Sequence, residues 1–158
     1  MSITGAYAEN FDTPDVTPLT AVGSDWLLEL WHGPTSAFKD MALQILPHLL
    51  SASLVKTNED KTVCILVATS GDTGKAALEG FKDVKGTRIM VFYPKDGVSA
   101  VQELQMNTQE GNNVGVCSVY GNFDDAQTGV KKLFSDEQLR IWGDMNEQYR
   151  HRSHCTAG

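Results

Sequence analysis

Residues 62–74 of the chain read TVCILVATSGDTG, and this stretch decides the fold class. It begins with a continuous, largely β-branched apolar run, which is typical of a parallel strand buried on both faces. Glycines and polar residues follow, and residues 75–83 then predict a helix. A strand, a glycine-containing turn and a helix in this order indicate one βα unit of an α/β protein.

The same alternation continues along the chain. Residues 88–93 (RIMVFY) and 114–119 (VGVCSV) predict two more strands. Ser99 and Gln102 form a capping box that begins the helix between these strands, and residues 123–134 predict a helix after the last one. Strands that alternate with helices imply right-handed crossovers, so we expect an open, mainly parallel α/β sheet with helices on both faces.

The segment before residue 62 has a different pattern. Residues 1–24 are polar with turn-forming prolines, and residues 26–30 (WLLEL) predict a short strand. Apolar residues then recur at the three- and four-residue spacing of an amphipathic helix, at Phe38, Met41, Ala42, Ile45, Leu46, Leu49 and Leu50. Pro47 is expected to kink or end the first part of this helix, because proline cannot donate a backbone hydrogen bond.

Composition argues against several classes of protein. The 158 residues include 20 Asp and Glu against 13 Lys and Arg, and the net charge of −7 argues against a nucleic-acid partner. No apolar run approaches the roughly 18 residues that cross a bilayer, and the N-terminus lacks a signal pattern, so we expect a cytoplasmic protein without a membrane partner. The 3 cysteines have no paired spacing, which indicates neither a disulfide framework nor a metal site. Cys64 and Cys117 fall inside strand runs and are expected to be buried.

Lys39 is the first candidate for chemistry. It follows Thr35 and Ser36, either of which is a suitable N-cap, so it should lie in the first turn of its helix. The positive end of a helix disfavours an ammonium group. On the helical wheel Lys39 lies at the margin of the apolar stripe, whereas Asp40 is expected to face solvent. A neutral amine beside apolar packing can form an imine with an aldehyde. The alternative is a surface lysine whose alkyl stem covers apolar neighbours.

The second candidate is the loop formed by Ser70, Gly71, Asp72, Thr73 and Gly74. It joins the carboxyl end of a strand to a helix N-terminus, where open α/β sheets bind ligands and free N–H groups favour a carboxylate or phosphate. The alternative is an ordinary βα turn in which a polar side chain caps the helix. A nucleotide-binding P-loop is excluded, because the glycine spacing is wrong and Ala76 stands where a magnesium-binding Ser or Thr is needed.

Four stretches together resemble threonine synthases. They are LELWHGPTSAFKDMALQ at residues 28–44, ATSGDTG at 68–74, VFYPKDGVS at 91–99 and GNFDDAQ at 121–127. The order and spacing of these stretches carry the resemblance, which extends over about residues 16–139. Residues 1–139 are therefore expected to form part of a catalytic domain of this family.

The resemblance implies a fold, a cofactor and a reaction. Threonine synthases are pyridoxal-phosphate enzymes of the tryptophan-synthase-β-like fold, and they convert O-phosphohomoserine and water to threonine and phosphate. By resemblance, Lys39 is the lysine that binds pyridoxal phosphate as a Schiff base and then moves protons on the substrate. Ser70, Gly71, Asp72 and Thr73 would form the loop near the cofactor ring and the substrate carboxylate.

The chain also departs from the family. Residues 140–158 do not resemble it, and we expect them to pack poorly; His151, His154 and Cys155 lack the partner cluster that a zinc site needs. Family members are longer and carry a glycine-rich cup for the cofactor phosphate, for which no second glycine-rich loop is found here. The chain is therefore expected to be an incomplete lyase. The alternatives are a non-catalytic α/β interaction module derived from such an enzyme, or another pyridoxal-phosphate lyase such as a dehydratase or phospholyase.

Overall fold

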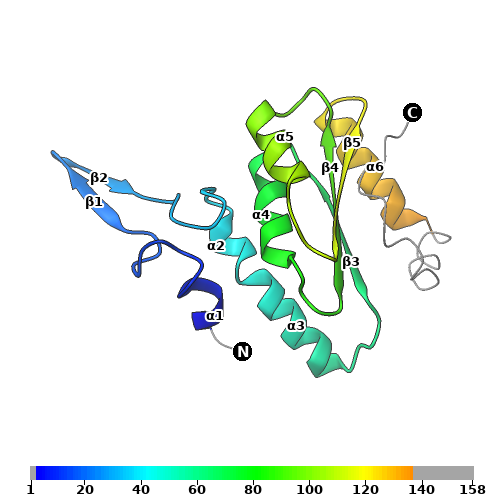
Figure 1. The fold of residues 1–158 in the computed structure, drawn as a ribbon, viewed down its shortest axis with the longest axis horizontal. Coiled ribbons are helices and arrows are strands. Elements are labelled where there is room, and N and C mark those ends of the chain that lie inside the picture. The colour runs from blue at the N-terminus through cyan, green and yellow to red at the C-terminus, as the bar shows by residue number, and fades with distance from the viewer. Residues whose placement is uncertain (1–2, 137–158) are drawn as a thin grey trace.

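The structure is a computed structural model that describes residues 3–136 of the chain. Strands and helices alternate from β3 onward (Figure 1). In chain order the elements are α1 (Ile3–Tyr7), β1 (Leu19–Val22), β2 (Asp25–Leu28), α2 (Asp40–Leu43), α3 (Leu46–Thr57), β3 (Val63–Ala68), α4 (Asp72–Phe81), β4 (Thr87–Pro94), α5 (Ala100–Asn107), β5 (Val114–Val119) and α6 (Phe123–Ser135).

The main sheet contains β3, β4 and β5 in that order, all parallel. Its register aligns Val67 of β3 with Val91 of β4, and Val91 with Val116 of β5. Each strand is joined to the next by a helix, because parallel neighbours need a crossover connection of about that length. The prediction of three parallel neighbouring strands is confirmed.

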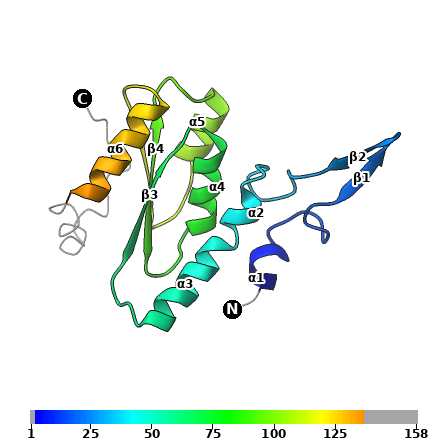
Figure 2. The same cartoon turned by 180° about the vertical axis from the view of Figure 1, so that it is seen from behind.

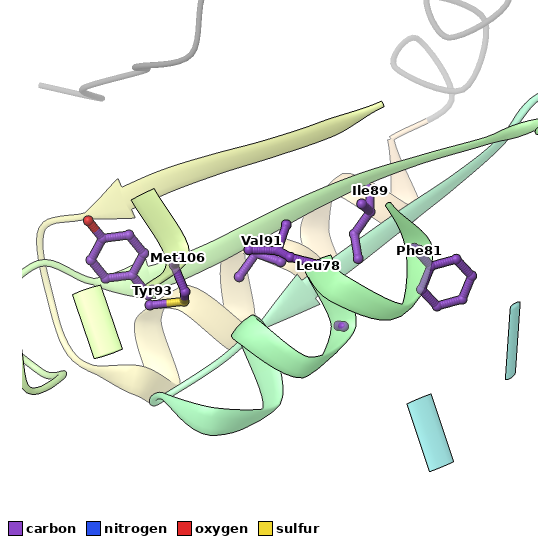
Figure 3. Close-up of a cluster of buried hydrophobic side chains, with 7 residues drawn as sticks. Leu78, Phe81, Ile89, Val91, Tyr93 and Met106 are labelled. Carbon is purple, nitrogen blue, oxygen red and sulfur yellow. The ribbon is translucent and has the colours of Figure 1, made fainter. Parts of the chain in front are cut away.

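Helices cover both faces of this sheet, as predicted. α4 packs on one face with α5 beside it, and α6 packs on the other face over β3 and β4 (Figures 1 and 2). Side chains alternate along a strand, so every second residue of β4 points toward α4. The buried core lies at this contact and consists of Ala77, Leu78, Phe81, Ile89, Val91, Tyr93 and Met106 (Figure 3).

The predicted amphipathic helix is divided in two near Pro47, as expected. α2 ends at Leu43, and Pro47 lies in the first turn of α3. The hydroxyl of Tyr7 donates to the carbonyl of Met41 at 2.7 Å, beside this break. The predicted apolar stripe is only partly covered, since Phe38, Leu46 and Leu49 are 45–55% exposed within the described chain.

An antiparallel hairpin precedes these helices and projects from the body of the molecule (Figure 1). Its second strand, β2, overlaps the short strand predicted at residues 26–30. Its first strand, β1, lies in a segment that composition alone described as polar. All residues of both strands are exposed. A hairpin formed from only two strands is marginally stable in water, so its pairing depends on the contacts at its base.

Two expectations about β3 are wrong. β3 was expected to be buried on both faces, but it is an edge strand, and most of its residues are only half-buried. Cys64 is exposed, whereas Cys117 on β5 is buried as expected. Among residues 3–136 both β3 and β5 pair only with β4, so an edge position alone does not account for this difference. Cys64 is the one exposed residue of β3 and lies near the beginning of the strand.

Two further expectations concern membrane-spanning helices and metal-binding groups. Across residues 3–136, no helix is long and apolar enough to cross a membrane, and no three His, Cys, Asp or Glu side chains gather as a metal-binding group. The predictions for the tail at residues 140–158, including His151, His154 and Cys155, lie outside the described residues.

Candidate functional site

The loop after β3 is organised by a buried threonine. Thr69 continues the ladder, its N–H donating to the carbonyl of Phe92 at 2.9 Å. Its hydroxyl oxygen accepts hydrogen bonds from the N–H groups of Gly71 at 3.0 Å and Gly74 at 2.9 Å. Because Thr69 is only 2% exposed, these bonds hold the loop against the sheet edge.

Gly71 is the N-cap of α4 and requires the conformational freedom of glycine. Its φ is 150°, and a Cβ atom at this position would overlap the side chain of Gln102. The backbone therefore turns sharply into the ten-residue helix α4. A larger residue at position 71 would be strained and would also displace Gln102.

The predicted anion-binding groups lie together on this loop. Ser70 and Asp72 are exposed and Thr73 is half-buried. Within residues 3–136, the N–H groups of Asp72 and Thr73 have no hydrogen-bond acceptor. Unpaired N–H groups at the positive end of a helix favour an anion. The loop therefore has donors that suit a carboxylate or phosphate, and the binding of such an anion stays a prediction.

Gln102 joins this loop to α5. Its Nε2 donates to Asp72 Oδ1 at 2.7 Å, and its Oε1 accepts from the N–H of Ser99 at 3.1 Å. The predicted capping box is confirmed, but its contact with the loop was not foreseen. A capping box is a local pattern, whereas the partner of Nε2 lies thirty residues away along the chain.

Lys39 occupies a slightly different position from the one predicted. It is the N-cap residue of α2 rather than a residue of its first turn, and neither Thr35 nor Ser36 acts as N-cap. Its side chain is half-buried, as a boundary residue should be, and Nζ lies 4.7 Å from the centroid of the Phe38 ring. Within the described chain Nζ forms no hydrogen bond or ion pair. No partner in the described residues therefore competes for this amine, and its role in the chemistry stays a prediction.

Asp40 was expected to face solvent, and this prediction is wrong. The residue is 1% exposed, and its carboxylate accepts hydrogen bonds from the N–H of Thr35 at 2.8 Å and from its hydroxyl at 2.6 Å. The helix begins one residue after Lys39, so the side chain of Asp40 can turn back onto the preceding loop. The pair closes the segment from Thr35 to Asp40, which contains Lys39, and fixes its backbone.

Packing between α2 and α4 links the two candidate sets. The carbonyl oxygen of Leu43 contacts Gly80, where a Cβ atom would overlap it. Pro47, four residues after Leu43, has no N–H to donate to this carbonyl. The carbonyl is therefore left without a helical hydrogen bond, and α2 can approach α4 closely there. The predicted anion-binding residues therefore share the loop that begins α4, namely Ser70, Gly71, Asp72 and Thr73. Lys39 begins the neighbouring helix α2. That its amine faces the loop stays a prediction.

The course of the chain also favours this end of β3 as a ligand site. α4 and α5 lie on one face and α6 on the other, so the connection out of β5 returns over β4 and β3 (Figure 2). The loop at residues 70–74 follows the carboxyl end of β3, and the carboxyl ends of the strands are the usual ligand site of open α/β sheets.

A polar cluster fixes the segment that leads to Lys39. His32 Nδ1 is 2.5 Å from Asp12 Oδ1, and its Nε2 is 2.6 Å from Glu29 Oε2. Hydrogen bonds to Glu29 and then to Asp12 raise the pKa of His32, which favours the imidazolium with two N–H donors. Bonds from Thr20 and then His32 lower the pKa of Glu29. Glu29 is only three residues from His32, but Asp12 lies in a separate segment, so the sequence pattern does not indicate the complete cluster.

Comparisons with known proteins identify relatives of this chain by sequence and by fold. The threonine synthase of Pseudomonas aeruginosa is 48% identical over 123 residues, which are 77% of this chain and 26% of that enzyme. The crystal structure of yeast threonine synthase matches with a TM-score of 0.79 and 39% identity, over 87% of this chain and 29% of that one. The structure of pyridoxal-phosphate-bound threonine synthase from Brucella melitensis matches with a TM-score of 0.79 and 35% identity, over 98% of this chain and 31% of that one. No family model matches the chain.

The fold and the loop therefore define an α/β chain of the tryptophan-synthase-β-like class. The chain is a homologue of threonine synthase. It spans about a quarter of the length of the curated relatives that it matches, so it corresponds to part of that enzyme.

Proposed function

We propose that this chain supplies the reactive lysine and one anion-binding loop of a threonine synthase active site. The reaction converts O-phosphohomoserine and water to threonine and phosphate, and we place it in the cytoplasm. The observation that carries the proposal is the loop at residues 70–74, whose free N–H groups lie at the carboxyl end of β3 in a chain 48% identical to a threonine synthase.

The residues present fit pyridoxal phosphate in two respects. Lys39 offers a half-buried amine without a hydrogen-bonded partner in the described residues, which is what an aldehyde needs for attachment. The N–H groups of Asp72 and Thr73 offer donors to an anionic group of the cofactor or the substrate. When bound, pyridoxal phosphate supplies an electron-withdrawing ring that makes the protons on the substrate carbons easier to remove.

The roles of the chain's own residues follow from their positions. In the net reaction the bond between the γ carbon and the phosphate oxygen breaks, the β carbon loses a proton and the γ carbon gains one. Water adds its hydroxyl to the β carbon, and its remaining proton goes to the released phosphate. Lys39 Nζ, once free, is the group that removes and returns protons. The loop from Ser70 to Thr73 holds the anionic end of the ligand, and Thr69 keeps that loop rigid.

A segment exchange tests the proposed function. The 123 matched residues of this chain replace their counterparts in the Pseudomonas aeruginosa enzyme, and phosphate release from O-phosphohomoserine is measured. We expect the exchanged enzyme to turn over, and Lys39→Ala in it to be inactive, while Lys56→Ala on exposed α3 remains active. A folded exchange protein that releases no phosphate, or that works without Lys39, would contradict the proposal. Turnover of another amino acid in place of O-phosphohomoserine would favour a different lyase.

A further inference from the structure

The amide of Gln102 serves two elements at once. Its Oε1 accepts from both the N–H and the hydroxyl of Ser99, each at 3.1 Å, and this completes the cap of α5. Its Nε2 donates to Asp72 Oδ1 at 2.7 Å. The same amide packs against Gly71. One side chain therefore fixes the loop before α4 to the beginning of α5.

The Asp72 carboxylate belongs to the first residue of α4. It therefore lies close to the free N–H groups of Asp72 and Thr73, with which it could pair in place of a ligand. Those groups favour any nearby anion, including a carboxylate of the protein itself. In the described residues, however, the Asp72 carboxylate accepts no hydrogen bond from the backbone of α4, and its Oδ1 is bound to Gln102.

We propose that Gln102 is a positioning residue for the anion-binding loop. By holding the Asp72 carboxylate outside the N-terminus of α4, it keeps the N–H groups of Asp72 and Thr73 open to an anionic ligand. The identity of that ligand as pyridoxal phosphate or the substrate rests on the proposed function. The hydrogen bond and its effect on the loop do not.

A reciprocal exchange isolates the contact from the cap. Gln102→Glu keeps an oxygen that accepts from Ser99, since glutamate also completes a capping box, but it places a carboxylate against Asp72 Oδ1. The added Asp72→Asn change restores a donor to that carboxylate, so the double variant regains the hydrogen bond with its direction reversed. Asp125→Ala is the control, because it breaks the capping box of α6 on the opposite face of the sheet.

Two readouts on the full chain separate this inference from the proposed function. The first is the NMR shift of the amide groups of Asp72 and Thr73 without ligand. We expect Gln102→Glu to move both, the double variant to bring the Thr73 amide back, and Asp125→Ala to leave both unchanged. The second is the affinity for pyridoxal phosphate, which should fall about tenfold in Gln102→Glu and recover in the double variant.

The outcomes are distinct. Unmoved loop amides in Gln102→Glu, or a double variant as perturbed as the single one, would overturn the positioning role. Moved amides with unchanged affinity would also overturn it, because anion binding would then not depend on Gln102 holding the Asp72 carboxylate away from the N–H groups. If the wild-type chain binds no pyridoxal phosphate, the proposed function fails, and the amide shifts alone decide the inference.

Discussion

The carbonyl oxygen of Leu43 occupies the space in which a Cβ atom of Gly80 would lie, at the contact of α2 with α4. This contact sets the distance between the helix that begins after Lys39 and the helix that carries the ligand loop. We expect Gly80→Ala to lower the free energy of unfolding by about 2 kcal/mol, because the added methyl group forces the two helices apart. Urea denaturation measures the change.

Gly129 on α6 gives the matched control, since no atom lies within 4 Å of a Cβ built there. Gly129→Ala should raise stability by roughly 0.5–1 kcal/mol, because alanine loses less backbone entropy in a helix. Equal effects of the two substitutions would show that α2 does not press on α4.

The second prediction concerns the buried pair Thr35 and Asp40. Asp40→Ala removes a carboxylate that accepts two hydrogen bonds and leaves the N–H and hydroxyl of Thr35 without an acceptor. We expect a loss of about 2 kcal/mol in the free energy of unfolding. Asp96→Ala, at an exposed position, should change it little. Similar losses for both variants would contradict the role given to Asp40.

The third prediction is a pH dependence centred on His32. Its pKa is raised above 6.5, so its contribution to stability is fully present below that value and is lost as pH rises through the folded-state pKa. The pKa of Glu29 is lowered below 4.5, so its contribution is present above that value and is lost as pH falls through the folded-state pKa. The cluster is therefore most stabilising in the mildly acidic range between these values.

The difference in urea midpoint between wild type and His32→Gln measures this contribution at each pH. We expect the difference to be large in the mildly acidic range and to shrink as the solution becomes alkaline. A difference that grows with pH would show that the neutral imidazole, not the imidazolium, is the stabilising form.

The fourth prediction compares two strand cysteines. Cys64 on the edge strand β3 is exposed and Cys117 on β5 is buried, so an alkylating reagent should modify Cys64 first. Partial burial raises the pKa of the Cys64 thiol above 9.0, so its rate should still increase with pH beyond that value. Peptide mass spectrometry assigns the label. Faster modification of Cys117 would contradict its burial.

Local sequence patterns predicted most of the elements from β3 to α6, where strands and helices alternate. The strand at residues 114–119 and the capping box of Ser99 and Gln102 match the structure, because apolar runs and caps depend on neighbours in sequence. The burial of Asp40 could not be predicted, because it depends on where α2 begins and on a loop that folds back through Thr35. The bond from Gln102 to Asp72 depends on tertiary packing, which no spacing rule describes.

The edge position of β3 also lay beyond sequence reasoning. An apolar run such as VCILVA is typical of a strand buried on both faces, yet most of its residues are half-buried and β4 is its only ladder partner among the described residues. The glycine-rich start of α4 has a local signature in the sequence, whereas the cofactor role of Lys39 follows from the family resemblance, and both site assignments stay predictions. Their mutual orientation depends on α2 and α4, and it stays a prediction.

Covalent labelling of the chain by pyridoxal phosphate tests the role of Lys39 most directly. The chain is mixed with the cofactor, reduced with borohydride and analysed by peptide mass spectrometry, with Lys39→Ala and Lys56→Ala beside it. We expect the label to gather on Lys39 in preference to every other lysine, to be lost in Lys39→Ala and to persist in Lys56→Ala. A label spread evenly over the lysines, unchanged in Lys39→Ala, would contradict the assignment of Lys39 as the cofactor lysine.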